Sequence, residues 1–211
     1  MRGRRASYLV VLILLAALSL GVHEVSASTL DLLGVGWNKA SVTVLIKAGK
    51  GVTAQAIDDV KTAIDDWNAA LNPLPSGESG PDLLLVNGVN TADIVIQMKV
   101  GGGTVLGQTL PKTISPFSCV LKSVTIQLSG KAFGTAFSSA GTQNVARHEL
   151  GHALGLGHNI DDPNDLMYGS AESAEIFGNT NVPISDCDKK GLDAVYPLPN
   201  FCAILDSVSC P

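Results

Sequence analysis

The hydrophobic positions along the chain follow two periods, and each period predicts a kind of element. Between Val52 and Leu71 the apolar side chains recur every three or four residues, which predicts a helix with one buried face. Short runs rich in β-branched residues predict strands at Val42–Ile46, Leu83–Val86, Ile94–Val100, Thr104–Leu110 and Val124–Leu128. This mixed order of elements favours an α+β fold.

Turn-forming residues separate these elements and delimit a second helix. The Asn72–Pro81 and Lys131–Gly141 stretches are rich in small and polar residues, so we expect loops there. The second helix should begin near Thr142, a suitable N-cap, and end near Gly155.

The C-terminal part of the chain is rich in turns. Asn159–Val182 contains no sustained hydrophobic period. Ser185 with Asp188 three residues later resembles a capping box, which predicts the start of a last helix. Pro197–Pro211 should form a tail held by disulfides.

The N-terminus has the composition of a secretory signal peptide. Met1–Arg5 contains three arginines, Tyr8–Leu20 is almost wholly apolar, and Val25–Ala27 is a cleavage site of the A-x-A kind. We therefore expect a secreted, extracellular protein, cleaved after Ala27, whose residues 28–211 form one domain. The apolar run is shorter than the about 20 residues of a spanning helix. An uncleaved N-terminal anchor is the alternative.

The charge of the mature chain excludes some partners. Removal of residues 1–27 takes away three arginines and Glu24, which leaves 11 basic and 18 acidic residues and a net charge of −7. Such a surface offers no basic patch for nucleic acid or an anionic membrane. We expect neither as a partner of the mature chain, and we expect a monomer.

Residues 148–158 carry the most specific pattern in the chain, HExxHxxGxxH. Residues four apart on a helix project from one face, so His148 and His152 can present two imidazoles to one metal ion. Gly155 can adopt a left-handed conformation and turn the chain back, which would bring in His158 as a third ligand. Three nitrogen ligands and an open fourth position describe a catalytic zinc site.

The distribution of histidines supports this interpretation. The chain has four, and His23 lies in the segment that we expect to be removed, so every histidine of the mature chain belongs to the motif. The alternative is an amphipathic helix with incidental histidines. A pattern that fixes five positions in eleven disfavours it.

On these residues the chain resembles the metzincin metallopeptidases and, among them, the matrixins. Residues 161–168, DDPNDLMY, are similar to the matrixin D-P-x-x-L-M-Y run, in which Met167 is the metzincin methionine. Residues 184–196 resemble the last helix of the family. The resemblance covers roughly residues 30–197. It implies a metzincin fold with a twisted, mostly parallel sheet, two long helices and a small C-terminal subdomain.

The chain also departs from the matrixin pattern. It has no cysteine-switch propeptide, and it has no histidines left for a second, structural zinc. We therefore expect one catalytic Zn²⁺, and nothing in the sequence supports Ca²⁺. Of the paired aspartates that begin the last helix in the family, the first is replaced by Cys187, and Asp188 remains.

All four cysteines lie in the mature chain, and an even count in an exported protein favours two disulfides over free thiols. Four cysteines permit three connectivities, and the sequence does not choose among them. Our preference is Cys202–Cys210, which closes a short C-terminal loop, with Cys119–Cys187, which joins the middle of the chain to the last helix.

The resemblance implies roles for the residues around the metal. Zinc lowers the pKa of a bound water, and Glu149 would accept the proton of that water as general base. Met167 would form an apolar floor beneath the histidines. Asp188 would lie buried beneath the methionine turn and accept hydrogen bonds from it.

By resemblance, an extended polypeptide substrate would lie along an edge strand and reach into a specificity pocket. The edge residues would be Val105, Leu106, Gly107 and Gln108, and the pocket would be bounded by Asn144, Leu150 and the segment after Tyr168.

The resulting hypothesis is a secreted zinc-dependent endopeptidase. One alternative is a zinc-dependent binding protein with a degenerate active site, but such a protein would not need Glu149, which this chain keeps. Another is a zinc hydrolase of a non-peptide substrate, which the motif does not exclude.

Overall fold

The structure is a computed structural model that describes residues 28–101, 105–115, 117–132, 135–169, 180–196, 202 and 206–210. The predicted signal peptide, residues 1–27, lies outside the described residues. Among the helices that the structure describes, none is long and apolar enough to cross a membrane.

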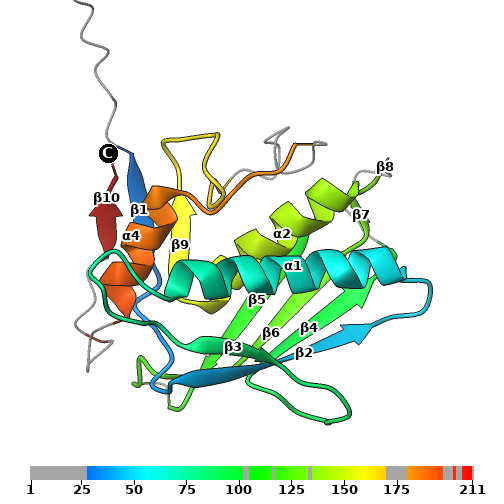
Figure 1. Ribbon diagram of the computed structural model, residues 1–211, viewed down its shortest axis with the longest axis horizontal. Coiled ribbons are helices and arrows are strands. Elements are labelled where there is room, and N and C mark those ends of the chain that lie inside the picture. The colour runs from blue at the N-terminus through cyan, green and yellow to red at the C-terminus, as the bar shows by residue number, and fades with distance from the viewer. Residues whose placement is uncertain are drawn as a thin grey trace, which may run out of the picture.

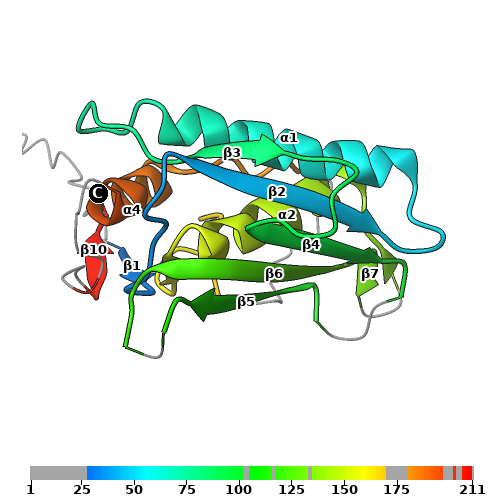
Figure 2. The ribbon, with the colours of Figure 1, turned by 90° about the horizontal axis from the view of Figure 1, so that it is seen from below.

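A five-stranded mixed sheet forms the centre of the molecule (Figure 2). Its strands are β2 (Ser41–Ala48), β3 (Asp82–Leu85), β4 (Ile94–Lys99), β5 (Gly107–Thr113) and β6 (Leu121–Ser129). They lie in the order β3-β2-β4-β6-β5. All are parallel except β5, which runs antiparallel to β6 at the edge. The α+β class and the mostly parallel sheet are thus confirmed, although β5 begins later than predicted.

Two helices cover one face of this sheet, and no helix of the described residues lies on the opposite face (Figures 1 and 2). The first is α1 (Ala54–Leu71), and the hydroxyl of its N-cap Thr53 accepts a hydrogen bond from the Ala56 amide. The predicted apolar stripe is buried against the sheet and the second helix, with Trp67 fully enclosed.

The second helix, α2 (Ser139–Ala153), begins earlier than the sequence predicted. Its N-cap is Ser138, whose hydroxyl accepts a hydrogen bond from the amide of Gly141, and not Thr142. The Ser139 hydroxyl bonds to Asp59 of α1 at 2.5 Å. A tertiary partner therefore stabilises a first turn whose small residues resemble a loop. The remainder of the predicted loop contains a short hairpin, β7 (Lys131–Ala132) and β8 (Thr135–Ala136).

A small antiparallel sheet, which the sequence did not reveal, joins distant parts of the chain. It has the order β10-β1-β9, formed by β10 (Ser207–Ser209), β1 (Thr29–Leu32) and β9 (Leu156–Asn159). The last helix, α4 (Asp186–Val195), packs against it (Figure 1). The predicted capping box between Ser185 and Asp188 is present.

The structure confirms two disulfides but not the preferred pairing. Cys119 is joined to Cys202 and Cys187 to Cys210, each with a Cα–Cα distance of 5.2 Å. The reason lies in the small sheet: β10 pairs with β1, and this places Cys210 beside α4, which carries Cys187. Both bonds therefore tie the tail to the body of the domain, and the Cys202–Cys210 and Cys119–Cys187 preference was wrong.

Candidate active site

A glycine turn after α2 brings the three histidines of the motif together. His148 and His152 lie near the C-terminal end of α2. Gly155 then adopts a φ of +103°, and a Cβ at this position would collide with the carbonyl oxygen of Val35, so the turn requires glycine. The chain returns as β9 with His158, and the potential ligand atoms of the three histidines lie within 4.8 Å of one another.

Hydrogen bonds orient two of the imidazoles. Nδ1 of His148 lies 2.7 Å from the carbonyl oxygen of Leu166, and Nδ1 of His152 lies 2.9 Å from that of Leu156. Because a carbonyl oxygen only accepts, each Nδ1 carries the proton, and each Nε2 keeps its lone pair for a metal ion.

The charge state of the histidines also fits a metal site. Burial, with a contribution from His152, lowers the pKa of His148 to about 3. Burial lowers the pKa of His152 to about 4 and also lowers that of His158. All three are therefore neutral near pH 7, which is the form that binds metal. A neutral three-nitrogen donor set fits zinc, and no other group of three metal-ligating side chains occurs among the residues that the structure describes.

Glu149 lies beneath the edge strand β5, where it is only 6% exposed. Burial raises the pKa of its carboxyl to about 7, and a hydrogen bond from Thr109 opposes that shift. The Thr109 hydroxyl lies 2.6 Å from Oε2 of Glu149. A carboxyl with a pKa near neutrality can both accept and return a proton at pH 7.

The turn that contains Met167 supports the histidines from below. Met167 is fully buried, and its sulfur fits against Gly151 of α2, where a Cβ would lie 2.5 Å from Sδ. The amide of Asn159, which follows His158, donates to the carbonyl oxygen of Met167 at 2.9 Å. Met167 therefore contacts α2 through its sulfur and β9 through its carbonyl oxygen.

Asp188 is fully buried, as predicted, but its hydrogen bonds differ from the prediction. Its Oδ2 accepts from the amide of Ser185 at 2.7 Å. The amide of Met167 donates to Asp165 instead, at 2.9 Å, and the Ser185 hydroxyl donates to the other oxygen of Asp165 at 2.8 Å. Asp165 stands two residues before Met167, so a local Asx-type bond can form without a distant partner. Ser185 thus connects Asp188 to the turn, since it bonds to both aspartates.

The predicted edge residues lie at the sheet edge or just before it. Gly107 and Gln108 belong to β5, which pairs with β6 on one side and is the last strand in the order. Val105 and Leu106 precede the strand; Val105 is 56% exposed, whereas Leu106 is buried.

Both of the predicted pocket residues that the structure describes are fully buried. Asn144 is fully buried, where it donates to the carbonyl oxygen of Thr180 and accepts from the amide of Val182, both at 2.9 Å. It therefore anchors the chain before the last helix. Leu150 is fully buried in the core. The segment after Gly169 lies outside the described residues.

Two residues around the site were missed by sequence reasoning. Thr109 reaches Glu149 from β5, and Asp165 holds the amide of Met167. The alternation of Gly107 and Thr109 on one side of a strand could have indicated the first, and the Asx-type spacing before Met167 could have indicated the second.

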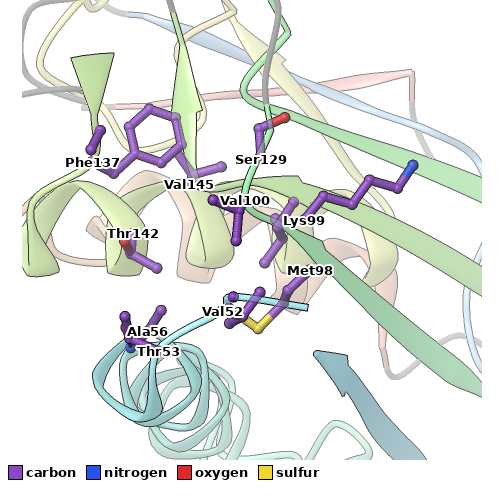
Figure 3. A pocket seen from close by; sticks show the side chains of 14 residues that line it. Val52, Thr53, Ala56, Met98, Lys99, Val100, Ser129, Phe137, Thr142 and Val145 are labelled. Carbon is purple, nitrogen blue, oxygen red and sulfur yellow. Dashed lines mark hydrogen bonds between the residues drawn. The ribbon is translucent and has the colours of Figure 1, made fainter. Parts of the chain in front are cut away.

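A separate apolar cavity of about 230 Å³ lies between the beginning of α1 and the ends of β4 and β6 (Figure 3). Val52, Met98, Val100, Phe137 and Val145 are among the side chains that line it. None of its lining residues belongs to the histidine motif.

Comparisons with known proteins bear on this site. No curated protein sequence matches the chain. Among solved structures, it is similar to high choriolytic enzyme 1, a hatching enzyme zinc-protease from the medaka fish Oryzias latipes, with 20% identity and a TM-score of 0.34. That match covers 58% of this chain and 50% of the other, so the chain spans about half the length of that protein.

The family comparison falls on the site itself. The model of the matrixin family matches residues 118–197, which include β6, α2, β9 and α4. The matched segment contains His148, His152 and His158. The chain is therefore similar to the matrixins over residues 118–197, and the matched segment holds the whole three-histidine site.

Proposed function

We propose that the protein is an exported endopeptidase that uses one zinc ion and Glu149 as general base. His148, His152 and His158 would hold the ion. The observation that carries this proposal is the convergence of three neutral imidazoles within 4.8 Å, next to a buried glutamate on α2, the helix that carries two of them. Calcium forms no part of the proposal.

A bound zinc ion would supply Lewis-acid activation of a water molecule and of the scissile carbonyl. Glu149 accepts the proton that the attacking water loses, and then gives it to the nitrogen of the leaving amine. Burial suits the carboxyl to both steps, since it raises the pKa to about 7. The Nδ1 bonds of His148 and His152 keep both rings in a metal-binding orientation.

The substrate in this proposal is an extended polypeptide that pairs with the edge strand. An edge strand has unpaired backbone groups that recognise a peptide without regard to its side chains. Gly107 and Gln108 of β5 lie on that edge, and the strand crosses directly over Glu149. Peptide bound there would run past the general base.

Export is proposed from the sequence of residues 1–27 and is supported by the two disulfides, which persist in oxidising compartments. Signal cleavage after Ala27 would then release a soluble monomeric domain. N-terminal sequencing of the exported protein tests this step: a chain that retains residues 1–27 would indicate the anchored alternative.

The activity is tested with the exported chain and casein as substrate, with and without a zinc chelator. The wild-type protein should cleave casein, and the chelator should abolish cleavage. Glu149→Gln should retain zinc but lose cleavage, since the three ligands remain and the base is absent. His152→Ala, the matched control, should lose both. A Glu149→Gln variant with nearly full activity would refute the assigned mechanism.

A further inference from the structure

Two residues of the edge strand act on the carboxylate of Glu149. The Thr109 hydroxyl lies 2.6 Å from Oε2 and 2.9 Å from the backbone oxygen of the same residue. Gly107 leaves space for the Glu149 side chain, because a Cβ at position 107 would lie 2.5 Å from both Cγ and Oε1 of Glu149. Residues two apart on a strand face the same side, so both act from the underside of β5.

We propose that Thr109 is a positioning residue for the general base, and that Gly107 provides the space in which Thr109 holds it. This inference rests on the proposed function of Glu149. In addition to pairing with substrate, β5 would then hold the Glu149 carboxylate that lies beneath it.

The distances distinguish the two bonds of the hydroxyl. A separation of 2.6 Å is typical of a hydroxyl that donates to an ionised carboxylate, and such a bond is stronger than one between neutral groups. The 2.9 Å contact to the backbone oxygen is an ordinary hydrogen bond. Because a hydroxyl has one proton, Thr109 donates to one of these acceptors at a time.

This arrangement provides a partner at each stage of the proposed proton transfer. Before transfer, Thr109 donates to Oε2 of Glu149. During transfer, Oε1 of Glu149 is the oxygen left to carry the proton, and Thr109 keeps its bond to Oε2. The carboxyl is therefore held in one place while it gains and loses a proton.

The central variant is Thr109→Val, which keeps the shape and the strand preference of threonine but removes the hydroxyl. We expect kcat to fall about ten- to hundredfold, since misplacement of a catalytic group by about 1 Å can cost about a hundredfold. KM should stay unchanged, because the hydroxyl faces Glu149 rather than the substrate. Thr109→Ser should restore most of kcat.

A matched control variant and a second perturbation separate a positioning role from an effect on folding. Thr113→Val removes a hydroxyl from the same strand that bonds to the carbonyl oxygen of Ser115, and it should leave kcat and KM unchanged. Zinc content and melting temperature should match the wild type in both threonine variants. Gly107→Ala, which forces Glu149 to move, should reduce kcat as Thr109→Val does.

A second readout does not need activity. The infrared band of the Glu149 carboxylate, identified by its loss in Glu149→Gln, should shift in metal-free Thr109→Val and return to its position in Thr109→Ser. A band that does not move would overturn the inference, since the hydroxyl would then not bind the carboxylate.

The outcomes distinguish this inference from the proposed function. If the wild type does not cleave peptide, or if Glu149→Gln remains active, the proposed function itself fails. If both behave as proposed but Thr109→Val retains wild-type kcat, only the positioning role fails. A rise in KM with unchanged kcat would show that Thr109 binds substrate, and failure of Thr109→Ser to restore kcat would show that the hydroxyl is not the active feature.

Discussion

Replacement of Asp188 by asparagine should change how the stability of the domain depends on pH. The carboxyl of Asp188 is fully buried, and among the described residues its Oδ1 has no hydrogen-bond partner. Burial, and next the nearby carboxylate of Asp165, raise its pKa to about 8. Both carboxyls bond to Ser185, so two acids share one small buried region.

The raised pKa fixes the sign of the effect. A carboxyl whose pKa is higher in the folded than in the unfolded protein favours folding when it is protonated. That contribution is fully present below the ordinary value of 3.8 and is lost as the pH rises towards about 8. The contribution of Asp188 to wild-type stability should therefore decline across this range. Asp188→Asn stays neutral and keeps an oxygen for the Ser185 amide, so its stability relative to the wild type should rise with pH.

The size of the gain follows from the unpaired oxygen. A buried acceptor without a partner costs about 1–3 kcal/mol, and more when it is charged. Asp188→Asn should then be more stable than the wild type by at least about 1–3 kcal/mol at pH 9. For a domain of this length, each kcal/mol shifts the melting temperature by about 2–4 °C. We expect little difference between the two proteins at pH 4.

Thermal melting of the metal-free protein from pH 4 to pH 9 measures this effect without the loss of zinc that histidine protonation would cause. The control is Asp186→Asn in the same first turn, where the side chain is 89% exposed and pairs with Lys189 at 3.0 Å. It should not change the pH profile. If the Asp188→Asn profile parallels the wild type, or if the variant is less stable at pH 9, ionised Asp188 does not oppose folding and the reasoning is wrong.

Two further predictions concern packing and covalent links. Gly151→Ala would place a Cβ 2.5 Å from the sulfur of Met167. This overpacking should lower the free energy of unfolding by about 1–3 kcal/mol, which exceeds the gain of about 1 kcal/mol from the higher helix propensity of alanine. Melting temperature and zinc retention should both fall, whereas Gly80→Ala, which overpacks a leucine of α1, should lower the melting temperature alone. Replacement of both Cys119 and Cys202 by serine should lower the free energy of unfolding, measured with denaturant, by about 4–5 kcal/mol, because their disulfide closes a loop of 83 residues. An unchanged unfolding midpoint would contradict this expectation.

The features that the sequence predicted correctly depend on short spacings. The stripe of α1 repeats with the period of a helix, and the strands of the large sheet are apolar runs bounded by turn residues. The pairing of His148 with His152 needs only the helical repeat, and the return of His158 needs only one glycine turn. Each of these can be inferred within about ten residues of chain.

The features that were missed depend on contacts between distant segments. The small sheet pairs β1 with β10, and no periodicity within either short strand identifies its partner. The disulfide pairing follows from that sheet, so it could not be chosen before the sheet was known. The partners of Asn144 could not be predicted for a similar reason: they are Thr180 and Val182, beyond a long turn-rich stretch of sequence.

The methionine turn explains how ligands from two separate elements keep one geometry. His148 belongs to α2 and His158 to β9, and a shift between these elements would open the three-histidine cluster. The carbonyl oxygen of Leu166 accepts from His148, and that of Met167 accepts from the amide that follows His158. Two adjacent carbonyls thus connect both elements. Because a buried N–H donor left unpaired is costly, neither bond can be lost without a penalty, and the turn therefore holds the histidines in position even though it contributes none of them.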